Sequence, residues 1–265
     1  MYLDYWELQT RPFDNTPDPK FFYFSQEHED AFLRLTYAVK ENKGAFMLSG
    51  EYGCGKTTLT RTFLQECFDA GNFEVAFLNN PVWDNASVDF FRDILFEFGE
   101  DAPKDYNRSE LFRLIGDVLM QNVNDGKINL LVVDEAQLIE HDKIFEDIRL
   151  LLNYQLDDVN LLTILIIGQP ELREKVLKFP QLEQRISLKY HLHTLNQTEV
   201  KEYIHHRMNV AGCKREIFTD DAFDEIYKRS FGTPRRINNI CDLALFIGFQ
   251  KKLEKIDAKV VASTV

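Results

Sequence analysis

The sequence lacks the long apolar run that a membrane-spanning helix requires. Its longest such run, residues 161–167, includes Thr163 and is far shorter than the roughly 20 residues that cross a bilayer. The opening stretch MYLDYWELQT has no basic segment followed by an apolar one, so we expect no secretory signal. The four cysteines show no CxxC spacing and are too few for a disulfide framework. We therefore expect a reduced, cytoplasmic protein with no membrane span of its own.

An excess of positive charge is also absent. The 31 Lys and Arg residues stand against 43 Asp and Glu, which gives a net charge of −12. Such a protein is poorly suited to indiscriminate nucleic-acid binding, which relies on neutralising phosphates with basic side chains. The region from Thr194 onward, with 12 basic and 10 acidic residues, is the one relatively basic part. It allows a local basic face but no basic arm.

The residues that are present favour a folded α/β protein. With 22 Phe, 10 Tyr and 45% hydrophobic residues, the chain of 265 residues can bury a large core. Short apolar strands are predicted at residues 45–48, 73–78, 130–133, 161–167 and 187–192. Helices are predicted between them, at residues 25–40, 57–68, 88–98, 110–124 and 143–154. This alternation predicts a parallel sheet with helices on both faces.

The strand pattern stops after Leu195, and helices are predicted at residues 197–211, 220–229 and 234–252. We therefore expect two domains, which suits the length of the chain. The first is an α/β base at residues 1–193, whose residues 1–25 form an irregular, proline-rich lead-in. The second is a small all-helical lid at residues 194–265.

The strongest motif begins at the end of the first predicted strand. It fits the pattern GxxxxGK[ST] at every fixed position and consists of Gly50, Glu51, Tyr52, Gly53, Cys54, Gly55, Lys56 and Thr57. A helix follows it directly, which is the setting of a loop that holds nucleotide phosphates on backbone N–H groups and a helix N-terminus. In such a loop Lys56 reaches the β- and γ-phosphates, and the Thr57 hydroxyl binds Mg²⁺.

A pair of acidic residues ends the third predicted strand, LLVVDE. Asp134 and Glu135 are expected at the carboxyl edge of the sheet, where the phosphate loop also lies. Asp134 is expected to hold Mg²⁺ through water, and Glu135 to polarise the attacking water. Two adjacent carboxylates repel each other, so a bound cation gives them a reason to coexist.

Two further residues allow alternative interpretations. Gln169 ends the next strand, LLTILIIG, and either hydrogen-bonds the γ-phosphate or water, or is a loop residue before a helix that Pro170 initiates. Cys54 stands in the phosphate loop next to a helix N-terminus, where the pKa of a thiol tends to fall. Its alternative interpretation is a small apolar side chain that the loop tolerates.

The order of these motifs resembles that of AAA+ ATPases, a branch of the P-loop NTPases. More narrowly, the chain is similar to the ExeA/GspA (general secretion pathway protein A) family, and it also resembles the transposon-encoded TniB/TnsC-like ATPases. The segments that carry the resemblance are YWELQTRPFDNTPDPKFFYFS, the phosphate loop, LLVVDEAQ, IIGQPEL, LEQRISLKYHL and GTPRRINNICDLAL. They are spread over nearly the whole chain.

The resemblance implies roles for residues outside the two main motifs. Arg185 matches the arginine finger that reaches the γ-phosphate of a neighbouring subunit, with Arg173 as the alternative. Arg235 matches the sensor-2 arginine of the lid, with Arg236 as the alternative. Gln169 takes the sensor-1 position. Thr58 joins the nucleotide-binding residues, and the lead-in around Phe13 and Pro17 is expected near the adenine.

The implied activity is ATP hydrolysis, with ATP and Mg²⁺ bound at an interface between subunits of a homo-oligomer, a ring or a filament. The nearest resemblance implies an accessory ATPase of secretion or pilus-type envelope machinery, with a protein partner not yet identified. One alternative is a regulator of transposition that assembles on double-stranded DNA. Another is a nucleotide-binding scaffold with little hydrolysis, against which the intact set of Lys56, Asp134 and Glu135 argues.

Overall fold

The computed structural model describes residues 2–16, 18–157 and 159–264. The chain folds into two compact units, each with its own hydrophobic core. The sheet unit consists of Asp30–Gly50 and Thr62–Leu192, and the helical unit of Met1–Glu29, Glu51–Arg61 and His193–Val265. The domain boundary at residues 193–194 stays a prediction.

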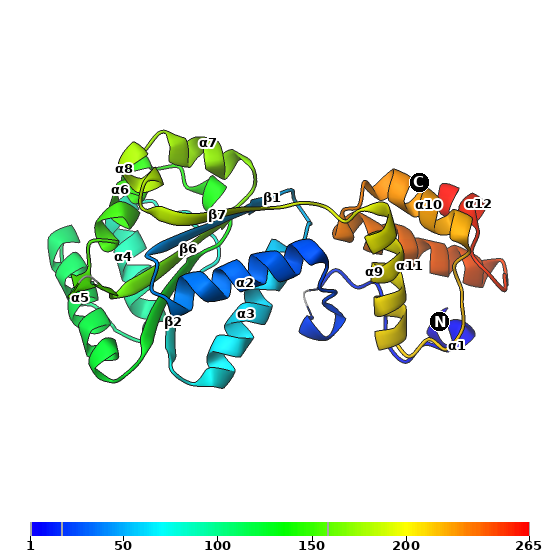
Figure 1. The fold of residues 1–265 in the computed structure, drawn as a ribbon, viewed down its shortest axis with the longest axis horizontal. Helices are drawn as coiled ribbons and strands as arrows, with labels where there is room; N and C mark the ends of the chain where they lie inside the picture. The colour runs from blue at the N-terminus through cyan, green and yellow to red at the C-terminus, as the bar shows by residue number, and fades with distance from the viewer. Residues whose placement is uncertain (1, 17, 158, 265) are drawn as a thin grey trace. The chain divides into compact units, whose positions relative to one another are not determined.

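Parallel strands form the centre of the sheet unit (Figure 1). Within the described residues, five strands pair in the order β2-β3-β6-β1-β7. Their bounds are β1 Ala45–Gly50, β2 Phe73–Leu78, β3 Ile128–Val133, β6 Leu162–Gly168 and β7 Ile186–Leu192. Nearly every residue of β1, β3 and β6 is buried, as expected of central strands covered on both faces. The α/β class and all five predicted strands are confirmed.

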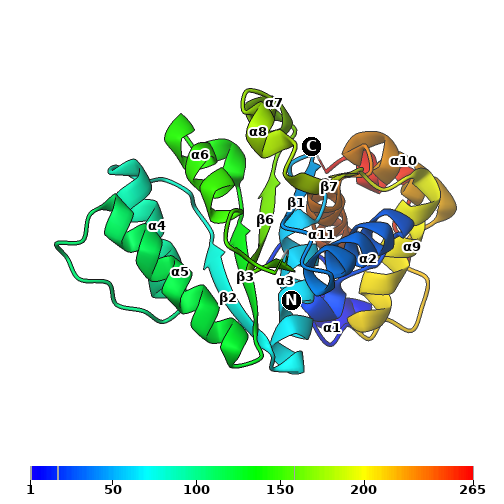
Figure 2. The same ribbon diagram turned by 60° about the vertical axis from the view of Figure 1, so that its left-hand side comes forward.

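Helices cover both faces of this sheet. Figures 1 and 2 show α4 and α5 side by side, and α2 and α3 on the opposite face. The bounds are α2 Gln26–Lys40, α3 Lys56–Ala70, α4 Ala86–Glu97, α5 Arg108–Asn124, α6 Asp142–Leu151, α7 Glu171–Leu177 and α8 Pro180–Glu183. A helix initiated by Pro170 was one of the two interpretations at Gln169, and α7 begins there with Pro170 as its N-cap. The sequence analysis did not predict α8, or the antiparallel pair β4 Gln155–Leu156 and β5 Val159–Asn160.

The carboxyl edge of the sheet brings three predicted site segments to neighbouring strands. Gly50 ends β1, Asp134 follows β3, and Gln169 follows β6. In the strand order, β6 lies between β3 and β1, and all three strands run parallel. Chain segments that leave neighbouring parallel strands at the same end meet at one edge, so the topology places these segments together.

The helical unit is built from both ends of the chain. Its helices are α1 Tyr2–Trp6, α9 Gln197–Val210, α10 Asp220–Ser230, α11 Pro234–Gln250 and α12 Ala258–Ala262, with the 3₁₀ turn η1 Pro19–Phe21. Trp6 is fully buried in this core, and its indole Nε1 donates a hydrogen bond to the carbonyl of Leu245. The three predicted C-terminal helices are confirmed, whereas α1, η1 and α12 were not predicted.

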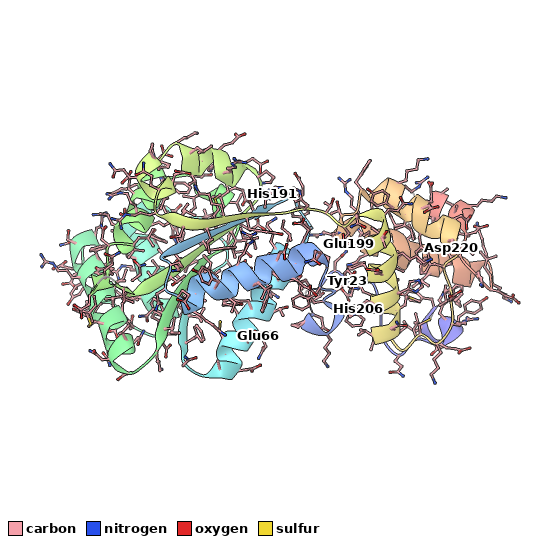
Figure 3. The ribbon with its side chains drawn as sticks, viewed as in Figure 1. Tyr23, Glu66, His191, Glu199, His206 and Asp220 are labelled. Carbon is pink, nitrogen blue, oxygen red and sulfur yellow. The ribbon has the colours of Figure 1, made fainter. Side chains whose placement is uncertain are left out.

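The lead-in is tied to α9 by polar contacts. Arg207, buried on α9, donates hydrogen bonds to the carbonyls of Pro12 and Asp14. Figure 3 shows Tyr23 beside His206 of α9, and the Tyr23 hydroxyl donates to Glu202. The lead-in is therefore ordered by the C-terminal helices.

In the described ranges, no helix is long and apolar enough to cross a membrane.

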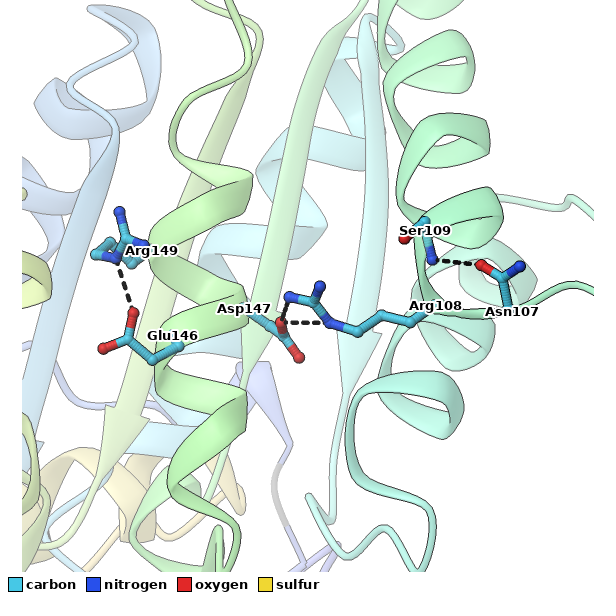
Figure 4. Close-up of polar contacts among 6 residues, drawn as sticks. All are labelled: Asn107, Arg108, Ser109, Glu146, Asp147 and Arg149. Atoms are coloured by element: carbon cyan, nitrogen blue, oxygen red, sulfur yellow. Dashed lines mark hydrogen bonds and ion pairs between the residues drawn. The ribbon is translucent and has the colours of Figure 1, made fainter.

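One ion pair with a buried carboxylate, called the buried pair below, joins two helices of the sheet unit (Figure 4). Arg108, at the start of α5, donates to the carboxylate of Asp147 on α6, and the Asp147 side chain has no exposed surface. Asn107 caps α5 by accepting from the backbone of Ser109. On the other side of α6, Glu146 and Arg149 form a pair in which Glu146 is 47% exposed. Both carboxylates lie on α6, but that of Asp147 is buried and that of Glu146 is partly exposed.

Removing one partner of the buried pair should destabilise the sheet unit far more than removing one partner of the exposed pair. Arg108→Met leaves the Asp147 carboxylate buried without its cation, which typically costs about 3 kcal/mol. Arg149→Met, the matched control, is expected to cost under about 1 kcal/mol. Urea unfolding of the two variants measures the difference, and equal losses would contradict it.

Candidate functional site

The phosphate loop combines left-handed glycines with a helix start. Gly53 and Gly55 have φ angles of 80° and 109°, a region that glycine adopts at the least cost. A Cβ on Gly53 would also lie 2.8 Å from the Cβ of Arg235, so close packing excludes a side chain there. The loop leads directly into the 15-residue α3, whose N-terminus favours an anion.

The side chain of Lys56 lies over the loop. It is buried, with 5% of its surface exposed, and its Nζ donates a hydrogen bond to the carbonyl of Glu51 at 3.1 Å. Thr57 and Thr58 follow in the first turn of α3 and are partly exposed. The ammonium group is therefore held at the mouth of the loop, and the two hydroxyl-bearing residues stand beside it in the sequence.

Cys54 is an apolar part of the loop. Its side chain is fully buried, and burial raises the pKa of the thiol although the charge of Lys56 opposes this. The expectation that the helix N-terminus lowers this pKa is therefore wrong in direction, because desolvation of the thiolate outweighs the nearby positive charges. This burial favours the interpretation of Cys54 as a small apolar side chain that the loop tolerates.

His28 contacts the phosphate loop, and the sequence analysis missed it. It lies on α2 with 2% of its surface exposed, and its Nε2 is 3.2 Å from the carbonyl oxygen of Cys54. A Cβ on Gly55 would lie only 2.7 Å from the same Nε2. Burial lowers the pKa of His28 to about 4, while the hydrogen bond to Cys54 opposes this shift. No local sequence signal marks His28, because its partner is a backbone carbonyl 26 residues away.

Arg235 contacts the phosphate loop from the start of α11. Its backbone N–H donates to the carbonyl of Gly53 at 3.4 Å, and its guanidinium stacks 4.9 Å from the ring centroid of Tyr52 while donating to the Tyr52 hydroxyl. Arg236 instead packs against the ring of Phe231. The two candidate arginines therefore diverge, and Arg235 is the one on the loop.

A pocket of about 520 Å³ opens beside these arginines. Polar, aromatic, basic and acidic side chains line it, and the phosphate loop forms one of its walls. The lining residues are Glu51, Tyr52, Thr194, Phe231, Thr233, Arg235, Arg236 and Asn239. In the lead-in, Phe13 is buried against Phe218 of the helical core, and Pro17 lies outside the described residues.

In the sheet unit, the carboxylate of Glu135 is held by two glutamines. Gln137 donates from Nε2 to Glu135 Oε2 at 2.5 Å, and Gln169 donates to the same oxygen at 3.5 Å. The backbone N–H of Gln169 donates in turn to Gln137 Oε1. Asp134 is buried and accepts the N–H of Glu135, whose φ of 52° is left-handed. Non-glycine residues in this region often mark functional sites.

Comparison with known proteins decides the family. The family model described as AAA domain matches residues 39–176, which is more than half of the chain. The chain belongs to the AAA domain family. It is also 39% identical to General secretion pathway protein A of Aeromonas hydrophila over 259 residues, covering 97% of this chain and 46% of that protein. The resemblance to the ExeA/GspA family is thereby confirmed, although the chain spans less than half of that relative.

Solved AAA structures share the fold. The Aeropyrum pernix ORC2 protein, in ADPNP–ADP complexes, superposes with a TM-score of 0.70 at 18% identity, covering 97% of this chain and 71% of that one. Drosophila ORC bound to DNA gives a TM-score of 0.70 at 15% identity, covering 96% and 63%. At such identities the likeness establishes the fold alone.

The two candidate finger residues of this AAA chain differ in how they are held. Arg185 is exposed just before β7, and its guanidinium donates to the carbonyl of Leu152, the C-cap of α6, at 2.9 Å. Arg173 is exposed on α7. The helix-end contact holds Arg185 in one orientation at the surface of the sheet unit.

The buried His28 should make the stability of the helical unit depend on pH. Because its folded pKa of about 4 lies below the unfolded value of about 6.5, unfolding takes up a proton between these values. Stability should therefore fall with pH from about 6.5 toward 4, with a slope approaching 1.4 kcal/mol per pH unit at about pH 5. Urea unfolding of the wild type and of His28→Gln measures this, since only the wild type should show the added slope. Parallel curves would contradict it.

Proposed function

We propose that this chain is an ATPase that binds ATP with Mg²⁺ and hydrolyses it at an interface between subunits. The observation that carries the proposal is the phosphate loop, in which Gly53 and Gly55 are left-handed and Lys56 lies over the loop at the start of α3. A glycine-rich loop, a helix N-terminus and an ammonium group together recognise polyphosphates.

Magnesium is the cation that these residues fit. Hydroxyl and carboxylate oxygens are its usual protein ligands, and Thr57 and Asp134 supply one of each. Asp134 is buried and fixed by the N–H of Glu135, so its orientation does not depend on the metal. When bound, the cation neutralises charge that develops on the phosphates.

Glu135 is the proposed water-orienting residue. Its carboxylate is held through Oε2 by Gln137 and Gln169. The proposed role of the other oxygen is to accept a proton from water. Gln169 thereby combines the predicted sensor position with a direct contact to the catalytic carboxylate. Arg235, packed on Tyr52, is the proposed contact between the lid helices and the nucleotide.

Replacing Lys56 tests the site itself. Lys56→Ala should abolish ATP binding because it removes the principal positive charge on the phosphates, whereas Glu135→Gln should bind normally and hydrolyse little. Titration of fluorescent ATP into the wild type and both variants measures binding, and their ATPase rates measure hydrolysis. Unchanged affinity in Lys56→Ala would overturn the site assignment, and binding with negligible hydrolysis by the wild type would favour a nucleotide-binding scaffold.

Mixing variants tests the shared interface. Arg185→Ala should keep nucleotide affinity and lose roughly 10³-fold or more in hydrolysis rate, because a finger in trans stabilises charge in the transition state. Mixing it with Glu135→Gln should partly restore turnover, since hybrid interfaces then combine an intact Arg185 with an intact Glu135. An Arg173→Ala variant is the control. If Arg185→Ala hydrolyses ATP at the normal rate at every protein concentration, Arg185 is not the arginine finger.

For the process that is powered, we propose an accessory role in secretion or pilus-type envelope machinery, supported by the similarity to General secretion pathway protein A. A regulator of transposition that assembles on DNA is the second candidate, supported by the fold shared with Drosophila ORC bound to DNA. Measuring the ATPase rate against protein concentration, with and without double-stranded DNA at moderate salt, separates them. Stimulation by DNA would favour the second, and a rate that rises with protein concentration alone would favour the first.

A further inference from the structure

The imidazole of His28 lies beneath the phosphate loop and uses both ring nitrogens. Nε2 is 3.2 Å from the carbonyl oxygen of Cys54, and Nδ1 is 2.6 Å from the hydroxyl of Ser25. A carbonyl only accepts, so the hydrogen bond assigns the proton to Nε2, and the Ser25 hydroxyl donates to Nδ1. The ring of Phe22 meets the imidazole edge-on with the centroids 5.1 Å apart. These contacts fix both the tautomer of the imidazole and the orientation of its ring plane.

The carbonyl that His28 holds determines where an N–H of the loop points. The C=O of Cys54 and the N–H of Gly55 belong to one planar trans peptide, so they point in opposite directions. A carbonyl drawn toward the buried ring turns the Gly55 N–H away from it. Gly55 has φ of 109°, and glycine offers little resistance to rotation of this peptide. An outside contact is therefore needed to fix it.

We propose that His28 is a positioning residue of the phosphate loop, which orients the peptide between Cys54 and Gly55 so that the Gly55 N–H faces a nucleotide phosphate. The inference rests on the proposed nucleotide binding. His28 itself touches no phosphate, because it is buried on the opposite side of the peptide. The fit also explains why Gly55 carries no side chain, since a Cβ would collide with Nε2 at 2.7 Å.

Two amide variants separate the hydrogen bond from mere burial of a polar group. The amide nitrogen of His28→Gln reaches about as far as Nε2 and keeps a donor for the Cys54 carbonyl. The amide of His28→Asn is as polar but reaches only as far as Nδ1, so it contacts Ser25 and not the loop. The readout is equilibrium titration with fluorescent ADP and fluorescent AMP, with urea midpoints to confirm folding.

The expected result is that His28→Asn binds ADP about tenfold more weakly than the wild type, while His28→Gln stays within about threefold. The loss should be larger for ADP than for AMP, because the loop acts on the phosphate chain. Ser25→Ala removes the hydroxyl that fixes the tautomer of His28, so it should also weaken ADP binding. This variant replaces His28→Asn in the test if His28→Asn does not fold.

The outcomes are distinguishable. A wild type that does not bind ADP would overturn the proposed function itself. If the wild type binds and folded His28→Asn or Ser25→Ala binds ADP as tightly, the positioning role is wrong. Equal losses in His28→Gln and His28→Asn, or equal losses for ADP and AMP, would overturn it as well.

Discussion

The organisation of the helical unit depends on one constraint, that the carbonyl groups of the phosphate loop need partners of their own. A loop that offers N–H groups to an anion leaves its carbonyls facing the protein, where an unpaired one is costly. The carbonyl of Glu51 accepts from Lys56, that of Gly53 from the backbone of Arg235, and that of Cys54 from His28. The carbonyl of Gly55 accepts from Leu59 within α3. Several elements thus converge on the loop because each satisfies one of its oxygens.

The sequence predicted the parts of the fold and the site that have local signatures. Runs of Val, Ile and Leu marked the buried strands, and the spacing of Gly50, Gly55 and Lys56 marked the phosphate loop. The acids after β3 were found in the same way. The roles of Arg185 and Arg235 came only from the family resemblance, whereas Gln169 was also marked by its place at the end of a buried strand. All three roles remain proposals.

What the sequence did not predict depends on contacts between distant segments. His28 hydrogen-bonds a backbone carbonyl. A sequence pattern does not show which side chain will contact a backbone atom of a distant segment. Gln137 lies in the LLVVDEAQ segment. Its hydrogen bond to the Glu135 carboxylate, however, is made beside a left-handed turn at Glu135 that the sequence does not mark. Trp6 was placed in an irregular lead-in, but a long-range core overrides weak local propensity, and α1 forms around it.

The hydrogen bond from Trp6 to Leu245 has a consequence for the order in which the two units fold. It joins residues 239 positions apart, and pairings of such long separation form slowly. The loop segment Glu51–Arg61 belongs to the same unit as this hydrogen bond. The sheet unit is built from segments between Asp30 and Leu192, whereas the helical unit needs segments from both sides of it. The sheet unit is therefore able to fold before the helical unit that contains the loop is complete.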